Sequence, residues 1–216
     1  MFTIITPTNR HQYKDVLADM HRMRYRIVVD QWGWDIPGLA PGCDKDQFDT
    51  GDTVYVVVRN ATGAVIATVR VNPTTGPHML SELFADYCDL QPFPVGEDVW
   101  ECSRFVTDRA VMADPVDDFR VRCQVGIGLT VYCLDHGINR LSWLTHQKFY
   151  NLVQQVWRTE PLGLPKRTDG NWAWIAAVSR IDFAALDRQL DRYRNAESIV
   201  AEQMMVRPGR AQVRSA

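Results

Sequence analysis

The sequence predicts an α/β fold, a three-layer sandwich with helices on both sides of one central mixed sheet. Strand-like runs rich in β-branched residues alternate along the chain with segments whose apolar residues recur at helical spacing. Two of the strand-like runs are joined by a hairpin turn, Asn-Ala-Thr-Gly at 60–63. Strands and helices mixed in this order are typical of helices packed against a shared sheet.

Length and composition set further limits. A chain of 216 residues suits one large domain with a sizeable core, and we expect it to span residues 1–207, with 208–216 a disordered basic tail. The net charge of −2 gives no argument for nucleic acid as a partner. No leader sequence and no apolar run of membrane-spanning length are visible, so we expect a cytoplasmic protein without a membrane partner.

The cysteines and histidines argue against a metal site. The five cysteines are odd in number and form no Cys-x-x-Cys pair, which is unlike a disulfide framework or a structural zinc site. The five histidines show no His-Glu-x-x-His spacing. We therefore expect a reducing compartment and no bound metal.

The N-terminal part reads as a strand at 2–5 and then a helix at 13–28, which ends near Trp32-Gly33-Trp34. Arg24 lies on or beside the apolar stripe of this helix. An isolated arginine in such a place commonly extends along the apolar surface to water, and the alternative is that it points inward at an acid.

An irregular loop at 35–44 leads into an acidic run at 44–52. Four acids in nine residues are usually a solvated turn. However, a buried-type strand at 53–58 follows at once, and it anchors Asp46 and Asp49 close to the edge of the sheet. After the hairpin turn, a second strand at 64–71 carries Arg70 near its end.

The strand at 99–106 is unusual because it carries Glu101 and Arg104 among apolar residues. A lone buried charge costs several kcal/mol, so both side chains need partners from elsewhere. Side chains alternate along a regular strand, and the two would then face opposite sides. We expect a β-bulge near Cys102 and Ser103 that brings them to one face.

The second half continues the alternation of elements. We expect the following: helix 79–84, helix 117–136 with Phe119, Cys123, Ile127, Val131 and Leu134 facing the core, strand 138–145, helix 148–157, loop 160–165, strand 172–178 and helix 183–199. Gly126 and Gly128 lie within the second of these helices, where each glycine costs up to about 1 kcal/mol relative to alanine. The pair indicates close packing or the close approach of a ligand.

We infer that the charged residues converge on one pocket for a zwitterionic, partly cationic substrate. The members of this cluster are Arg24, Asp46, Asp49, Arg70, Glu101 and Arg104. The alternative is a structural ion-pair network inside the core, because such networks also perturb pKa values.

The ordered set of motifs resembles the acyl-homoserine-lactone synthases, the autoinducer synthases of bacterial quorum sensing. The resemblance rests on Arg24, Trp34, Asp46 and Asp49 within 46–55, Arg70, Pro73-Thr74-Thr75-Gly76-Pro77, and Glu101-Cys102-Ser103-Arg104-Phe105. Val28 departs from the family, which usually has phenylalanine there. The resemblance implies a fold like that of the GCN5-related N-acetyltransferases. It also implies transfer of an acyl group from a thioester to the amine of S-adenosylmethionine, followed by closure of a homoserine lactone and release of methylthioadenosine.

Roles for single residues follow from this resemblance and from the chemistry of the substrate. S-adenosylmethionine carries a sulfonium, an ammonium and a carboxylate, so its pocket needs both acids and arginines, and it is a substrate, with no separate cofactor expected. Glu101 is our candidate for the base that takes a proton from the amine, and Arg104 is the second catalytic candidate. The substrate-binding candidates are Arg24, Val28, Trp34, Asp46, Asp49, Arg70 and Phe105. The acyl-pocket candidates are Ser103, Trp143 and Trp174. The bulk of the two tryptophans favours a short, branched or aromatic acyl group.

The acyl donor is either an acyl-coenzyme A or an acyl carrier protein. Cys123-Gln124-Val125-Gly126-Ile127-Gly128 misses the first position of the pyrophosphate-binding loop of acetyltransferases, whereas Leu162-Gly163-Leu164-Pro165 resembles family members that use coenzyme A. Two other functions remain open from the sequence. They are an N-acetyltransferase acting on another amine and a non-catalytic sensor of S-adenosylmethionine or an acyl thioester.

Overall fold

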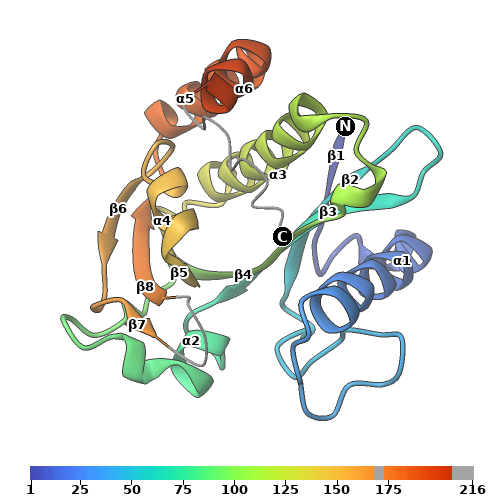
Figure 1. Ribbon diagram of the computed structural model, residues 1–216. Helices are drawn as coiled ribbons and strands as arrows, with labels where there is room; N and C mark the ends of the chain where they lie inside the picture. The colour runs from blue at the N-terminus through green and yellow to red at the C-terminus, as the bar shows by residue number, and fades with distance from the viewer. Residues whose placement is uncertain (168–172, 206–216) are drawn as a thin grey trace, which may run out of the picture.

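The computed structural model describes residues 1–167 and 173–205, which form a curved sheet with helices on both faces (Figure 1). The strands are β1 (Phe2–Ile5), β2 (Val54–Arg59), β3 (Val65–Pro73), β4 (Val99–Thr107), β5 (Arg140–His146), β6 (Arg158–Pro161), β7 (Lys166–Arg167) and β8 (Ala173–Arg180). The helices are α1 (Lys14–Tyr25), α2 (Met79–Leu83), α3 (Pro115–Asp135), α4 (Gln147–Val153), α5 (Phe183–Arg194) and α6 (Ala196–Met205). A π-helical segment, Arg26–Gln31, extends α1.

The sheet is mixed, as the sequence predicts. Its order is β1-β2-β3-β4-β5-β8-β6, with β7 also paired to β8. The pairing of β4 with β5 is parallel, and the other pairings are antiparallel. The ladder between β4 and β5 covers three residue pairs and ends at Glu101 and Ser142, although both strands continue. The sheet therefore forks at Glu101.

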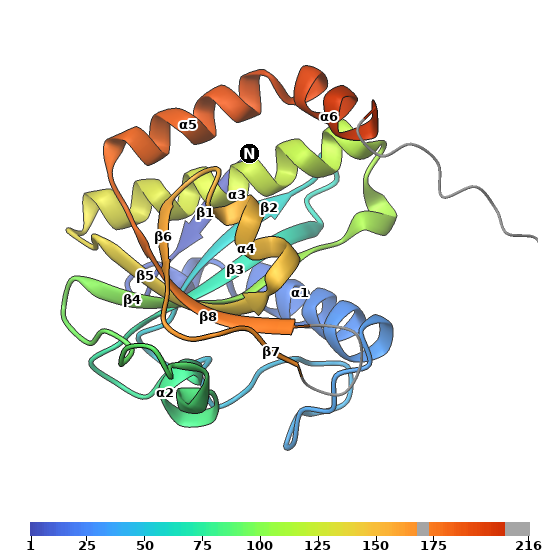
Figure 2. The same cartoon turned by 60° about the vertical axis from the view of Figure 1, so that its left-hand side comes forward.

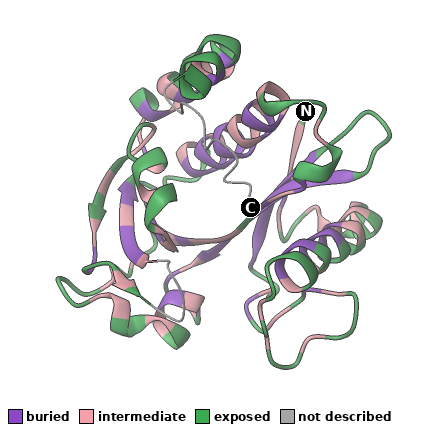
Figure 3. Ribbon diagram, in the orientation of Figure 1, coloured by how far each residue is buried: buried purple, intermediate pink, exposed green. Residues whose placement is uncertain are grey.

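The helices form layers on the two faces of the sheet. On one side α3 packs against the strands, and α5 and α6 lie beyond it (Figures 1 and 2). On the other side lie α1 and α2. Buried residues follow the strands and the inward sides of α1 and α3, whereas the outward sides of α5 and α6 are exposed (Figure 3). The three-layer prediction is confirmed, with α5 and α6 as an additional outer cover.

The side of α3 that faces the sheet differs from the prediction, except that Leu134 is partly buried against the core cluster of the sheet as expected. Val121, Val125 and Leu129 belong to the core cluster against the sheet, whereas Phe119 packs in a separate cluster with α6, with Cys123 partly buried against it. Because α3 lies between the sheet and two further helices, it is apolar on two sides, and helical periodicity alone does not say which side meets the sheet.

The two glycines of α3 mark close packing between elements. A Cβ on Gly128 would lie 2.7 Å from Val56 and 2.8 Å from Phe2, so only glycine lets α3 approach β1 and β2 this closely. A Cβ on Gly126 would lie 3.3 Å from Gln189 of α5. Of the two interpretations of these glycines, the structure supports packing.

Three other segments differ from the prediction. The single helix expected at 183–199 is divided into α5 and α6 at Asn195. The helix expected at 148–157 ends at Val153, and the expected loop at 160–165 begins within the edge strand β6. Pairing with β8 stabilises β6, and such long-range pairing leaves little local signal in a segment that contains proline. The expected tail at 208–216 and residue Trp172 lie outside the described residues.

Two further observations concern the sequence predictions. All five cysteines are free thiols, in agreement with the absence of a disulfide framework. Across residues 1–167 and 173–205, none of the helices combines the length and the apolar composition needed to cross a membrane.

Candidate functional site

Three arginines and three aspartates form a closed ring of ion pairs on the face of the sheet that carries α1 and α2. The arginines come from three elements, α1, β3 and β4, and the aspartates come from one loop at 44–49. The order around the ring is Arg24, Asp44, Arg104, Asp46, Arg70 and Asp49. Segments that are far apart in the sequence are thus joined by alternating charges.

Arg24 points inward and is fully buried. Its Nε donates to Asp44 Oδ2 at 3.1 Å and its Nη2 to Asp44 Oδ1 at 3.1 Å, while its Nη1 donates to Asp49 Oδ1 at 2.8 Å. Two bidentate pairs fix the plane of the guanidinium. Of the two possibilities for Arg24, the structure therefore supports the inward one.

Arg70 and Arg104 complete the ring through Asp46. Arg70 Nη1 lies 2.5 Å from Asp46 Oδ1 and 3.0 Å from Asp49 Oδ2. Arg104 donates from Nη2 to Asp46 Oδ2 at 2.9 Å and from Nε to Asp44 Oδ2 at 3.0 Å. Equal numbers of positive and negative groups make the ring electrically neutral, which offsets part of the cost of burying it.

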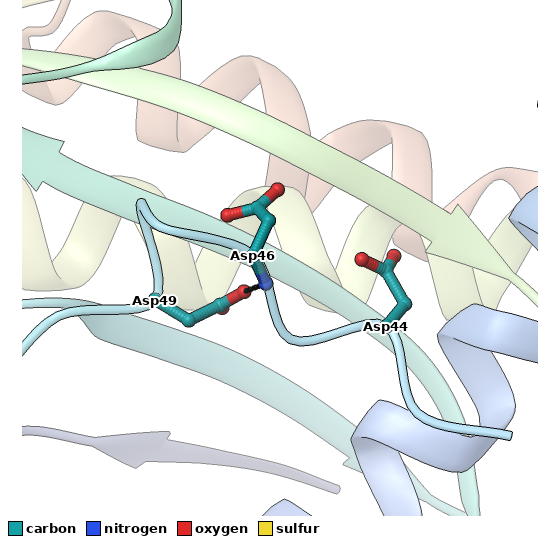
Figure 4. A group of neighbouring side chains, drawn as sticks. All are labelled: Asp44, Asp46 and Asp49. Carbon is teal, nitrogen blue, oxygen red and sulfur yellow. Dashed lines mark hydrogen bonds between the residues drawn. The ribbon is translucent and has the colours of Figure 1, made fainter. Parts of the chain in front are cut away.

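The three aspartates are grouped as in a cation-binding site, but their oxygens already bind arginine side chains. One oxygen of each lies within 4.8 Å of the others (Figure 4). Figure 4 also shows the backbone N–H of Asp46 donating to Asp49 at 2.9 Å. All six carboxylate oxygens accept from a guanidinium group. The three arginines therefore account for the way in which these carboxylates are grouped.

The ring changes the ionisation of its acids. Burial alone raises the pKa of Asp49, but Arg24 and Arg70 outweigh it and hold that pKa well below its usual range. In the same way burial opposes ionisation of Asp44, while Arg24 and Arg104 lower its pKa. Both carboxylates are therefore charged at neutral pH.

We expect the ring to make stability fall in acid. A carboxylate whose pKa is lowered by folding contributes stability above its unfolded pKa, about 4 for aspartate, and this stability is lost as the pH falls toward the folded pKa. The free energy of unfolding, measured with urea from pH 3 to 8, should be flat above about pH 5 and should drop steeply below about pH 4. A constant value down to pH 3 would contradict the lowered pKa values of Asp44 and Asp49.

The predicted β-bulge exists and lies slightly further along β4. Thr68 pairs with Val106 and Arg70 with Ser103, so Arg104 and Phe105 together oppose one residue of β3. Arg104 has a φ of 51°, a left-handed conformation that costs of order 1 kcal/mol for a residue other than glycine.

This bulge brings Glu101 and Arg104 to the same face. Glu101 accepts from the backbone N–H of Leu80, and Arg104 Nη1 lies 3.8 Å from the sulfur of the adjacent Met79. Both side chains therefore meet the start of α2.

Glu101 is buried beside the ring. Its Oε1 accepts from Leu80 N at 3.0 Å, and only 2% of the residue is exposed. Burial raises the pKa of Glu101, and the nearby Arg70 opposes this shift without cancelling it. A carboxylate with a raised pKa is a stronger base than an exposed one, which suits it to take a proton from an amine.

A half-open cavity of about 440 Å³ adjoins the ring. Asp46 and Arg104 line its charged side, and its apolar side includes Trp34, Phe48, Met79 and Phe84. The indole of Trp34 lies 5.7 Å from the Arg104 guanidinium and 5.8 Å from the ring of Trp174. The cavity thus combines ionic groups with an aromatic wall, as a ligand with a flat ring and charged ends requires.

The acyl-pocket candidates lie on both faces of the sheet. Ser103 accepts a hydrogen bond from Arg70 Nε at 3.0 Å, and Trp174 contacts Trp34. Trp143 is 7% exposed in the core toward α3, where its Nε1 donates to Ser179 Oγ at 2.9 Å.

Two substrate-binding candidates belong neither to the ring of ion pairs nor to the lining of the cavity. Val28 is fully buried in the core beneath α1, with Met20 and Met23, and is not among the residues that line the cavity. Phe105 is 40% exposed on the bulge. Their roles in binding stay predictions.

Sequence reasoning missed two residues of the site. Asp44 begins the acidic run at 44–52 and looks like its solvated neighbours in the sequence, yet it is fully buried between two arginines. The sequence indicates only that Met79 starts a helix, yet its sulfur accepts from Arg70 Nη2 at 2.9 Å. The predicted cluster has three arginines but only two acids from the loop, and this imbalance of charge indicates that the loop supplies a third acid.

Comparisons with known proteins identify a family model, relatives and solved structures that are similar to this chain. The family model described as autoinducer synthase matches residues 8–182. The isovaleryl-homoserine lactone synthase of Bradyrhizobium diazoefficiens is 30% identical over 181 residues, which are 82% of this chain and 79% of the relative. A solved structure of the coenzyme A-dependent acyl-homoserine lactone synthase BjaI, with S-adenosylmethionine and isopentyl-coenzyme A, superposes with a TM-score of 0.80 at 29% identity and covers 89% of each chain.

A more distant similarity concerns the fold alone. A putative N-acetyltransferase from Lactobacillus plantarum has a TM-score of 0.51 at 15% identity and covers 84% of this chain and 99% of its own. The predicted likeness to N-acetyltransferases is therefore confirmed at the level of architecture.

Proposed function

This chain belongs to the autoinducer synthase family and is an acyl-homoserine-lactone synthase, and we propose that it acylates S-adenosylmethionine from an acyl-coenzyme A. The observation that carries the proposal is the buried Glu101 beside a neutral ring of three arginines and three aspartates, next to a cavity with an aromatic wall. The similarity to BjaI, whose structure holds S-adenosylmethionine and an acyl-coenzyme A, supports the same pair of substrates.

The cavity suits the three charged groups of S-adenosylmethionine. Asp46 offers negative charge on the cavity wall, and Arg104 offers positive charge beside it for the substrate carboxylate. Trp34 presents an indole face on which adenine can stack. Because the ring already fixes these side chains, little further ordering is needed when the substrate binds.

Acylation requires a neutral amine. In our proposal Glu101 takes the proton from the substrate ammonium, and the amine nitrogen then attacks the thioester carbonyl. A new C–N bond forms, and the tetrahedral intermediate collapses with cleavage of the C–S bond. The nitrogen gives its second proton to the leaving thiolate, which departs as the thiol, and the proton taken by Glu101 is released to solvent. Backbone N–H groups at the bulge of β4, a few residues beyond the fork at Glu101, are the candidates for binding the oxyanion.

Lactone formation then depends on positioning. The substrate carboxylate attacks the γ-carbon, the C–S⁺ bond breaks, and methylthioadenosine leaves as a neutral thioether. This step needs no further base because the carboxylate is already ionised. The protein contributes by holding carboxylate and γ-carbon in line, which is the kind of assistance that raises effective concentration most.

Product analysis tests this function. The purified protein should convert S-adenosylmethionine and an acyl-coenzyme A into methylthioadenosine and an acyl-homoserine lactone in equal amounts, detected by mass spectrometry. A panel of acyl groups on coenzyme A and on acyl carrier protein identifies the donor. Free thiol without methylthioadenosine would indicate an N-acetyltransferase that uses another amine. Binding of either substrate without any product would indicate a sensor.

The size of Trp143 predicts which acyl groups are accepted. A buried indole between β5, β8 and α4 fills space that a longer acyl chain needs. The Trp143→Val variant should therefore raise kcat/KM for an eight-carbon acyl-coenzyme A at least tenfold relative to a branched five-carbon one, since each methylene buried is worth about 0.8 kcal/mol. Trp157→Val, at a tryptophan outside β5, serves as the control. An unchanged preference in Trp143→Val would contradict the acyl-pocket assignment.

A further inference from the structure

Three buried polar atoms near Glu101 lack hydrogen-bond partners within the described part of the chain. They are Glu101 Oε2, His78 Nε2 and Ser142 Oγ. The three residues are 2%, 1% and 0% exposed, respectively. Buried polar groups without partners are rare because each costs of order 1–3 kcal/mol, so three around one residue need an explanation.

The topology makes the three residues neighbours. Glu101 pairs with Ser142 at the last rung of the parallel ladder between β4 and β5, and paired residues of adjacent strands face the same side of a sheet. His78 precedes α2, and two residues later the N–H of Leu80 holds the other oxygen of Glu101. Glu101 is thus flanked by Ser142 on β5 and by His78 at the start of α2.

One water molecule can form a hydrogen bond with each of these three atoms. His78 Nδ1 lies 3.0 Å from the carbonyl oxygen of Gly76, which only accepts, so Nδ1 carries the hydrogen and Nε2 is an acceptor in the neutral ring. A water can donate to Nε2 and to Glu101 Oε2 and accept from the hydroxyl of Ser142. Three bonds of this kind are usual for a buried water.

We propose that His78 and Ser142 are positioning residues that hold a buried water against Glu101 and so set the pH range in which Glu101 acts as a base. This inference rests on the proposed role of Glu101 in acylation. The water donates to the carboxylate and stabilises its charged form. When Glu101 takes the amine proton on Oε2, the protonated oxygen donates to the water, and the water keeps its bond to Nε2. The thiolate takes the second proton of the attacking nitrogen, and Glu101 then releases its own proton to solvent, so no net proton is stored.

The charged and titratable groups that face Glu101 come from three elements. Arg70 on β3 favours its ionised form, His78 before α2 faces it as the acceptor of the water, and Cys102 is its neighbour on β4. Burial raises the pKa of the Cys102 thiol, so this group is neutral in the relevant pH range. Removing the water bond leaves Arg70 as the remaining stabilising charge and should raise the pKa of Glu101 further.

The dependence of kcat on pH at saturating substrates tests this inference. In His78→Phe, which keeps a ring against Phe93, the midpoint of the rising limb should move up by about one pH unit. The rate should then fall about tenfold below the midpoint and approach the wild-type value at high pH. Ser142→Ala should shift the midpoint in the same direction by a smaller amount.

Two further variants separate positioning from folding. His78→Gln offers an amide oxygen as acceptor and should restore a midpoint close to that of the wild type. His11→Phe, at an exposed histidine, should leave the whole profile unchanged. An unshifted midpoint in His78→Phe, with only a lower plateau or a lower unfolding free energy, would overturn the inference.

Two variants distinguish an error in this inference from an error in the proposed role of Glu101 as the base. If Glu101→Gln keeps its activity, the role of Glu101 is wrong, whatever His78 does. If Glu101→Gln is inactive and His78→Phe keeps the wild-type midpoint, the base assignment stands and the water link is wrong.

Discussion

The Glu101→Gln variant should lose about 10²–10⁴-fold of the acylation rate, because an amide cannot take a proton from the substrate ammonium. The side chain has almost the same shape, and its oxygen can still accept from Leu80 N. Binding of S-adenosylmethionine should therefore change little. The measurement is the rate of methylthioadenosine release at saturating substrates, together with the affinity for S-adenosylmethionine by calorimetry.

Urea unfolding of Glu101→Gln distinguishes a loss of catalysis from misfolding. Burial raises the pKa of Glu101 in the folded state, so its contribution to stability is present below the unfolded pKa and is lost as the pH rises through the folded pKa. At neutral pH the Gln variant should thus unfold at no lower urea concentration than the wild type. Glu82→Gln, at an exposed glutamate of α2, is the matched control. Glu101→Gln with the full rate would remove the base assignment.

Asp44→Asn should destabilise the protein by about 3 kcal/mol or more, because removal of one partner from a buried ion pair leaves uncompensated charge. Arg24 and Arg104 both donate to this carboxylate, and all three residues are nearly or fully excluded from solvent. The ring then carries a net positive charge. Urea unfolding measures the change, and activity should fall as well because Arg104 lines the cavity.

The control for Asp44 comes from the same loop. Asp52 is exposed at the end of the acidic run, and Asp52→Asn should change the unfolding free energy by less than about 0.5 kcal/mol. Equal stability of the Asp44 and Asp52 variants would contradict the buried ring.

The sequence predicts the sheet and the charged cluster for physical reasons. Runs such as 54–58 are continuous in β-branched residues, and strand propensity, burial and turn chemistry agree there. The charged residues stand out because Glu101 and Arg104 interrupt an apolar strand, and burying a charge requires a partner. The structure shows that they converge: Arg104 is a member of the ring of ion pairs, and Glu101 is buried beside it.

The features that the sequence did not predict depend on long-range contacts. Asp44 resembles its solvated neighbours in the sequence, and only the three-dimensional meeting of Arg24 and Arg104 buries it. The bulge forms at Arg104 and Phe105 because the register of β3 against β4 is decided by pairing on both sides of that point. Which side of α3 meets the sheet depends on α5 and α6, which follow much later in the chain.

The most direct test of the account is a crystal structure of Glu101→Gln with S-adenosylmethionine. The account predicts that the adenine lies on Trp34, the carboxylate beside Arg104 and the amino group toward residue 101. S-adenosylmethionine bound away from this cavity, or with its amino group turned from residue 101, would contradict it.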